Sequence, residues 1–281
     1  MSLPTQVDGT VEGRAALIIG HPGHELRVHR WLELARPTVY VLTDGSGHTG
    51  RSRLRSTSKV LSAAGATPGR IYGSFSDADL YAAMLSSNRA ILSRVVHAVA
   101  DALVCSKVDY VVADALEGFN PSHDLCRYLV NAAVALTNIP LRNFEFLLEG
   151  SPSACPDHLK AGSVRLELTE ADLTRKIAAA KSYPELRDET DAALARFGAA
   201  AFRTECLRPV RDLRQGLDAL DQEPPYYERY GEQQVAAGHY DRVIRYRQHI
   251  QPLVQALWHA VGLNGTQTTV TTVSALTGTA I

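Results

Sequence analysis

The stretch RAALIIGHPGHELRVHRWLELARPTVYVLTDG, residues 14–45, decides the fold. It opens with the apolar run 14–20 and closes with the β-branched run 38–45, and both runs end in Gly or Asp-Gly, as buried strands of a parallel sheet often do. Residues 24–35 between them have the length of a helix, with apolar residues among polar neighbours. Strand, helix and strand in this order predict a βαβ unit.

Strand-like and helix-like segments continue to alternate after residue 45. The expected elements are a helix over 53–66, a strand over 69–75, a helical stretch over 76–107, a strand over 108–116 and a helix over 122–138. Ser76, followed three residues later by Asp79, is close to a capping box at the start of one of these helices. The alternation predicts an α/β protein with a Rossmann-like, mostly parallel sheet flanked by helices. In such sheets, ligands bind beyond the carboxyl ends of the strands.

The pattern changes at about residue 150, where helical and loop-like segments follow. We expect residues 1–150 to form a Rossmann-like core and residues 151–281 to be a helical and loop extension that completes the same domain and provides a lid or oligomer contacts. The stretch PPYYERYGEQQ (224–234) suits a substrate wall or a dimer contact equally well. The Thr-rich tail 264–281 suits a final strand, a partner-binding arm or disorder.

The composition narrows the class of ligand. The 281 residues carry 29 basic and 30 acidic groups. We therefore expect a small-molecule substrate and no nucleic-acid partner. Four widely spaced cysteines indicate reduced thiols, and no apolar run approaches the ~18 to 20 residues of a membrane span. The first 13 residues lack the layout of a signal peptide. We therefore expect a cytoplasmic protein, either a monomer or a homo-oligomer.

Three histidines lie where expected strands end. His21 and His24 follow the first strand, and His123 lies in EGFNPSHD (117–124), between a later strand and its helix. Three imidazoles could form one face around Zn²⁺ at ~2.0 to 2.1 Å each and leave the fourth position to water. Such a metal lowers the pKa of its water to about 7 and polarises a carbonyl oxygen. The H-x-x-H spacing alone also suits an incidental surface pair.

The order of short motifs adds a resemblance to a known family. HPGHE, LTDG, an Arg-containing helix that closes in Ala-Gly, GSFSDADL and NPSHD follow one another over residues 14–138. This succession resembles the PIG-L, or LmbE-like, N-deacetylases. The resemblance implies a Rossmann-like fold and a Zn²⁺-dependent removal of acyl groups from N-acetylglucosamine-type conjugates.

The resemblance also assigns roles to residues. It places the metal ligands on His21, His24 and His123, with His24 where the family has Asp, and it places a substrate contact on Arg53. Asp44, in the loop LTDGSG, joins Arg53 as a candidate substrate-binding residue, although Asp-Gly there is also typical of a turn.

Three positions depart from the family pattern. Gly23 stands where the family has its general base Asp, Asn120 stands where it has a His that assists the intermediate, and Ser122 stands where it has the Asp that orients this His. A neutral His24 in place of Asp raises the net charge of the metal centre by one, which makes the bound water more acidic. A more acidic water needs less help from a base.

Other acids could replace the missing base. The candidates are Glu25, Asp114, Glu117 and Asp124. We prefer Glu117, since it lies in a loop at the expected edge of the sheet, and Asn120 could still donate a hydrogen bond to an oxyanion.

The sequence thus predicts a zinc-dependent hydrolase of an N-acyl amine, such as an amino sugar or a related small conjugate. Two alternatives remain. One is a family relative that binds metal and a ligand or partner without hydrolysis, which the loss of the usual acid and base groups favours. The other is a different zinc-assisted biosynthetic reaction.

Overall fold

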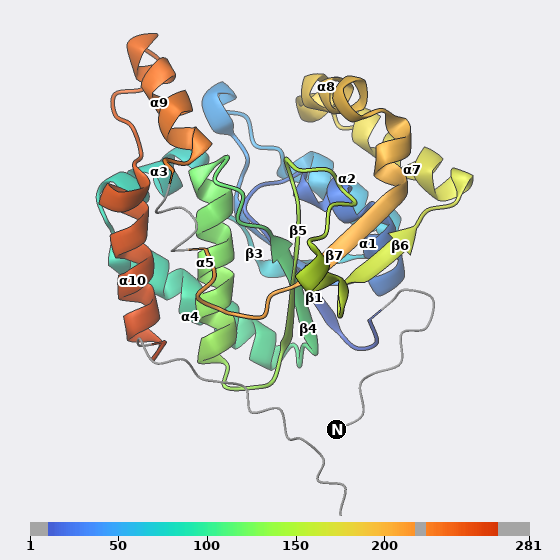
Figure 1. The fold of residues 1–281 in the computed structure, drawn as a ribbon, viewed down its shortest axis with the longest axis horizontal. Coiled ribbons are helices and arrows are strands. Elements are labelled where there is room, and N and C mark those ends of the chain that lie inside the picture. The colour runs from blue at the N-terminus through green and yellow to red at the C-terminus, as the bar shows by residue number, and fades with distance from the viewer. Residues whose placement is uncertain (1–10, 217–222, 264–281) are drawn as a thin grey trace, which may run out of the picture.

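The computed structural model describes residues 11–216 and 223–263, and its centre is a seven-stranded sheet (Figure 1). The strand order is β3-β2-β1-β4-β5-β7-β6. The strands are β1 (Ala15–Ile19), β2 (Thr38–Thr43), β3 (Thr67–Phe75), β4 (Tyr110–Asp114), β5 (Arg142–Phe146), β6 (Val164–Glu167) and β7 (Thr204–Pro209).

Strands β1 to β5 are parallel, whereas β7 runs antiparallel to both β5 and β6. The predicted α/β class with a mostly parallel sheet is therefore confirmed. Residues beyond 150 contribute β6 and β7 to this sheet, so the expectation of helices and loops alone was incomplete. Both strands carry charged residues, because they form the antiparallel side of the sheet rather than its buried centre.

Helices cover both faces of the sheet (Figure 1). One face packs against η1 (His24–Val28), α1 (His29–Ala35), α2 (Leu54–Ala64) and α7 (Glu170–Lys181), and the other against α3 (Asp77–Leu85), α4 (Arg89–Cys105), α5 (Pro121–Leu136) and α10 (Gln251–Ala260). The remaining helical segments are η2 (Gly47–Thr49), α6 (Asp157–Lys160), η3 (Pro184–Leu186), α8 (Arg187–Phe197), η4 (Ala199–Arg203), α9 (Tyr226–Ala236) and the π-helical turn η6 (Tyr246–Ile250).

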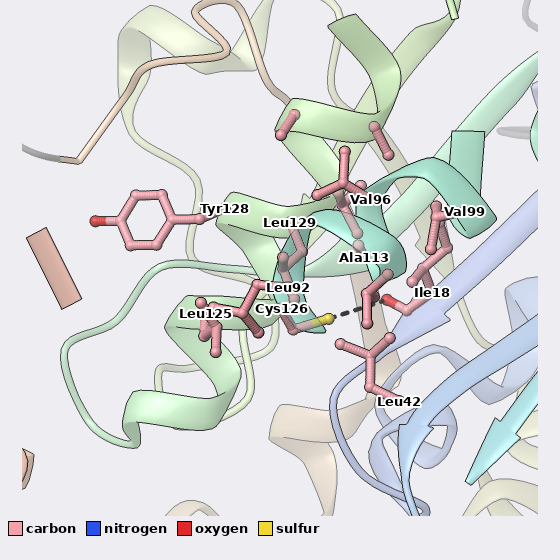
Figure 2. Close-up of a cluster of buried hydrophobic side chains, with 14 of the residues drawn as sticks. Ile18, Leu42, Leu92, Val96, Val99, Ala113, Leu125, Cys126, Tyr128 and Leu129 are labelled. Atoms are coloured by element: carbon pink, nitrogen blue, oxygen red, sulfur yellow. Dashed lines mark hydrogen bonds between the residues drawn. The ribbon is translucent and has the colours of Figure 1, made fainter. Parts of the chain in front are cut away.

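The two layers of the core follow from the alternation of side chains along β1. Leu17 and Ile19 face one layer, and Ala16 and Ile18 face the other, all without solvent exposure. Figure 2 shows the second layer, where Ile18 and side chains of neighbouring strands meet α4 and α5. Full burial of a large aliphatic side chain contributes about 1.5 to 3 kcal/mol, so these central strands hold the loops at their carboxyl ends in place.

One predicted helix differs in the structure. The helical stretch 76–107 is divided into α3 and α4, because Ser87 has a left-handed backbone and Asn88 caps the start of α4. The segment 231–262 is helical only in parts, since α9 ends at Ala236 and α10 begins at Gln251. The Thr-rich tail lies outside the described residues. In the part of the chain that is described, no helix has both the length and the apolar character to cross a bilayer.

Candidate metal centre

The three predicted histidines meet at two neighbouring strand ends. His21 follows β1, His24 begins η1, and His123 lies in the first turn of α5, beyond the end of β4. Asn120 caps α5 by accepting a hydrogen bond from the Ser122 amide at 2.8 Å. Because β1 and β4 are adjacent and parallel, their carboxyl ends bring residues about 100 positions apart into contact.

The imidazole rings form a compact triangle. The ring centres of His21 and His24 are 5.3 Å apart, those of His21 and His123 are 5.0 Å apart, and those of His24 and His123 are 4.5 Å apart, all edge to face. Three zinc–nitrogen bonds of ~2.0 to 2.1 Å in a tetrahedral arrangement would place ring centres roughly 5 Å apart. The spacing of the rings therefore fits a three-histidine zinc site.

The orientation of the three rings fits a metal site less well than their spacing does. Within residues 11–216 and 223–263, no group of three or more His, Cys, Asp or Glu side chains is arranged to hold a metal ion as the side chains stand. The three rings thus have the spacing of a metal site without its complete arrangement.

Hydrogen bonds hold the His21 ring in one orientation. Its Nδ1 lies 2.8 Å from Thr43 Oγ1 and 3.0 Å from Asp77 Oδ1. The Thr43 hydroxyl donates to the Gly20 carbonyl, and the Asp77 carboxylate only accepts, so the shared proton is assigned to Nδ1. This leaves the lone pair on Nε2, which is buried without a hydrogen-bond partner in the described structure. A buried, unpaired Nε2 is suited to bind a metal.

His24 is held in a similar way. Its Nδ1 lies 2.9 Å from Asp114 Oδ2, which also accepts a hydrogen bond from the Gly20 amide at 2.7 Å. Burial raises the pKa of Asp114 to about 7, since the carboxyl group has no exposure to solvent. Asp114, a candidate base in the sequence, therefore lies beside the cluster as the partner of His24.

The surroundings of His24 and His123 favour the neutral forms of these two rings. Burial, followed by the nearby His21, holds the pKa of His24 well below its usual value, and burial followed by His24 does the same for His123. A neutral imidazole is the form that binds a metal ion.

Burial raises the pKa of Asp77, but the contact with the His21 ring and the hydrogen bond from the Gly47 amide outweigh it and leave that pKa below the usual range of Asp.

Gly23 has no space for a side chain. Its φ of 107° is unfavourable for other residues, and a Cβ built there would lie 2.2 Å from Leu186 Cδ1 and 3.8 Å from Tyr183 Cζ. Tyr183 is anchored at this position, since its hydroxyl contacts Thr57 Oγ1 at 2.9 Å and the Arg53 carbonyl at 3.1 Å. The segment around η3 therefore covers the turn where the family pattern has its base.

Glu117 is engaged elsewhere. Its Oε2 accepts from the Leu148 amide at 2.6 Å, its Oε1 accepts from the Gly150 amide at 2.8 Å, and the Glu149 amide contacts both oxygens. Arg27 donates to the carbonyls at the two ends of the same loop. These contacts favour an anchoring role for Glu117 over the role of base that the sequence suggested.

Two further candidate acids also bind backbone amides. Glu25 accepts from the Gly23 amide at 2.7 Å, and Asp124 accepts from the amides of Glu117 and Gly118 at 3.1 and 3.2 Å. Burial raises the pKa of each carboxyl group to about 7. Glu25 and Asp124 thus hold the two turns that carry the histidines.

The two candidate substrate residues share one loop. Arg53 caps α2, and its amide donates to the Asp44 carbonyl at 2.8 Å. The Asp44 carboxylate accepts from the Ser46 amide at 3.0 Å, which is the turn-forming contact expected of Asp-Gly. The positive charge of Arg53 contributes to the low pKa of His24, so the guanidinium acts on the cluster.

Three aromatic side chains form a row at the turn between β4 and α5, the turn that leads to His123. The rings of Phe119 and Tyr226 are stacked with centres 4.8 Å apart, and Tyr230 continues the row at 6.1 Å from Tyr226. Each of the three residues is about two-fifths exposed. The Tyr227 amide donates to the Gly118 carbonyl, so α9 rests on the loop that leads to His123.

Sequence reasoning missed two residues of the site, Asp77 and Leu186. Asp77 lies between the residues of the capping box, Ser76 and Asp79, and a carboxylate directly after the end of β3 is a signal that could have identified it. Leu186 had no such signal, because its contact with Gly23 depends on how the extension packs.

Solved structures provide the comparison with known proteins. A deacetylase in the biosynthesis pathway of teicoplanin matches 72% of this chain and 100% of its own, with 16% identity and a TM-score of 0.50. The chain has the fold of this deacetylase. The α/β fold with a mostly parallel sheet that the sequence predicts is thus shared with a solved structure, and at this identity the likeness extends to the fold alone.

Two more deacetylase structures are similar. A zinc-inhibited form of teicoplanin deacetylase matches 72% of this chain and 100% of its own, with 14% identity and a TM-score of 0.46. The A40926 pseudoaglycone deacetylase matches 70% and 96%, with 18% identity and a TM-score of 0.43. No family model and no curated protein matches the chain.

Proposed function

We propose that the chain is a zinc-dependent hydrolase of an N-acyl amine, with His21, His24 and His123 as the metal ligands. The observation that carries this proposal is the triangle of rings, in which carboxylates occupy Nδ1 of His21 and His24. Carboxylate–histidine pairs of this kind orient metal ligands in known sites.

When bound, zinc would polarise the amide carbonyl and supply an acidic water. The side chains of the protein account for the other requirements. Arg53 lies close enough for its charge to act on His24, so it is suited to hold an anionic or polar group of the substrate. Asn120 uses its Oδ1 as a helix cap, which leaves its amide NH₂ to donate to an oxyanion.

The group that accepts a proton from the attacking water decides between hydrolysis and the main alternative, which is binding without hydrolysis. Glu25, Glu117 and Asp124 all bind backbone amides, and Gly23 is covered by Leu186. Hydrolysis would therefore depend on how strongly a zinc ion with three neutral histidine ligands acidifies its water. If that acidity is insufficient, the same arrangement supports binding of metal and ligand without hydrolysis.

The substrate we propose is a small conjugate that contains a ring, such as an N-acetylated amino sugar. The exposed row of Phe119, Tyr226 and Tyr230 supports this, because flat aromatic faces suit sugar and aryl rings.

Metal analysis of the purified full chain tests the proposal. We expect about one zinc per chain, and we expect His123→Ala to lose it, because only two imidazoles would remain. The control is His97→Ala, which removes an exposed histidine of α4 whose ring contacts the Ser93 carbonyl of its own helix. Near-zero zinc in the wild type, or unchanged zinc in His123→Ala, contradicts the proposal.

Acetate release from N-acetylated amino sugars then separates the two functions. Release that stops on chelation and returns with zinc supports hydrolysis. Binding of the same sugars by calorimetry without release supports the alternative.

A further inference from the structure

Asp77 contacts two different parts of the site. It is the first residue of α3, directly beyond β3, and its side chain is 13% exposed. Oδ1 lies 3.0 Å from His21 Nδ1, and Oδ2 accepts a hydrogen bond from the Gly47 amide at 2.6 Å. One carboxylate thus joins a proposed metal ligand to the loop between Asp44 and Arg53.

That loop is held at its base and near its tip. At the base, the Asp44 amide donates to the Phe75 carbonyl and the Arg53 amide donates to the Asp44 carbonyl, both at 2.8 Å. Near the tip, the contact between Gly47 and Asp77 ties the loop to α3. The position of both proposed substrate residues therefore depends on bonds that converge at the end of β3.

We propose that Asp77 is a positioning residue that couples the metal site to the loop 44–53. This inference rests on the proposed function. By accepting the proton of His21 Nδ1, Asp77 keeps Nε2 free to bind the metal. Through its second oxygen it holds the loop, so zinc binding and loop order support each other.

Asp79 provides a matched comparison. It lies two residues later in the same turn of α3, and its carboxylate accepts hydrogen bonds from the amide and the hydroxyl of Ser76. Substituting Asp79 removes a charge and a capping contact from the same helix without touching His21 or Gly47. A general loss of helix stability would therefore affect both variants.

The test compares zinc affinity, measured by competition with a chromophoric chelator, in the full-length wild type, Asp77→Ala and Asp79→Ala. We expect Asp77→Ala to bind zinc about 10- to 100-fold more weakly, the range typical of lost outer-shell partners, and Asp79→Ala to match the wild type. Asp77→Asn retains an acceptor for one of the two contacts, so an intermediate affinity is expected. Asp77→Asn also serves as the second variant if Asp77→Ala fails to fold.

Hydrogen exchange of the peptide amides in 44–53 supplies the second measurement. Saturating zinc should slow this exchange in the wild type and in Asp79→Ala, but not in Asp77→Ala. Wild-type zinc affinity in Asp77→Ala overturns the positioning role, and equal slowing of the loop by zinc in all variants overturns the coupling. A wild type that binds no zinc is a different result, because it contradicts the proposed function itself.

Discussion

The two turns that carry the histidines are stabilised in different ways. The turn after β4 is held by residues close to it in sequence, because Asn120 caps its own helix and Asp124 binds the amides of Glu117 and Gly118. The turn after β1 has its own local contact from Glu25, but Leu186 of the extension also covers it. The turn after β4 also contacts distant segments, through Glu117 to the Leu148 amide and through Gly118 to the Tyr227 amide. The difference is that short-range hydrogen bonds shape the turn after β4, whereas a distant side chain packs directly on the turn after β1.

The largest expected effect concerns the covered turn. Gly23→Asp, which restores the acid of the family pattern, places a side chain at a φ of 107° and against Leu186. Backbone strain of about 1 to 3 kcal/mol, and overpacking of about 1 kcal/mol against the flexible end of Leu186, should lower the free energy of unfolding by roughly 2 to 4 kcal/mol. Urea denaturation measures this loss.

The double variant Gly23→Asp/Leu186→Ala sharpens the result. Removing the Leu186 side chain relieves the overlap but not the strain, so we expect it to recover part of the lost stability. If Gly23→Asp alone is as stable as the wild type, the extension does not cover this turn as described.

Glu117→Gln should have the next largest effect on stability. The amide keeps one oxygen acceptor but loses the charge that binds the amides of residues 148–150, which should cost about 1 to 3 kcal/mol in chemical denaturation. Zinc content should not change. Glu149→Gln removes the same charge from the same loop and serves as control. A Glu117→Gln variant of wild-type stability that has lost hydrolysis would instead support the role of base.

The contrast between the turns also explains what the sequence could predict. The strands β1 to β4 and the position of the three histidines at strand ends were predicted, because each follows from a local pattern of apolar runs. The contact of His21 with Asp77 joins residues 56 positions apart, and that of Glu117 with Leu148 joins residues 31 apart. A local pattern identifies these side chains as acids but does not determine which group each one contacts.

The strands β6 and β7 illustrate the same limit. They pair antiparallel at the edge of the sheet, where short segments with charged residues are tolerated, so neither resembles the apolar runs of the centre. Leu186 lies between these two strands in the chain, and its contact with Gly23 requires the extension to fold back onto the sheet.

The smallest expected effect on stability concerns the helix cap in the turn after β4. Asn120→Ala removes the cap of α5 and should cost about 0.5 to 2 kcal/mol, whereas Asn120→Asp keeps an acceptor for the Ser122 amide and should leave stability nearly unchanged. The two variants separate capping from catalysis, because both lack the side-chain NH₂ proposed to bind an oxyanion. If Asn120 has that role, both should lose hydrolysis about 10²- to 10³-fold in kcat while KM changes little. If Asn120 only caps the helix, the loss in Asn120→Ala should disappear in Asn120→Asp.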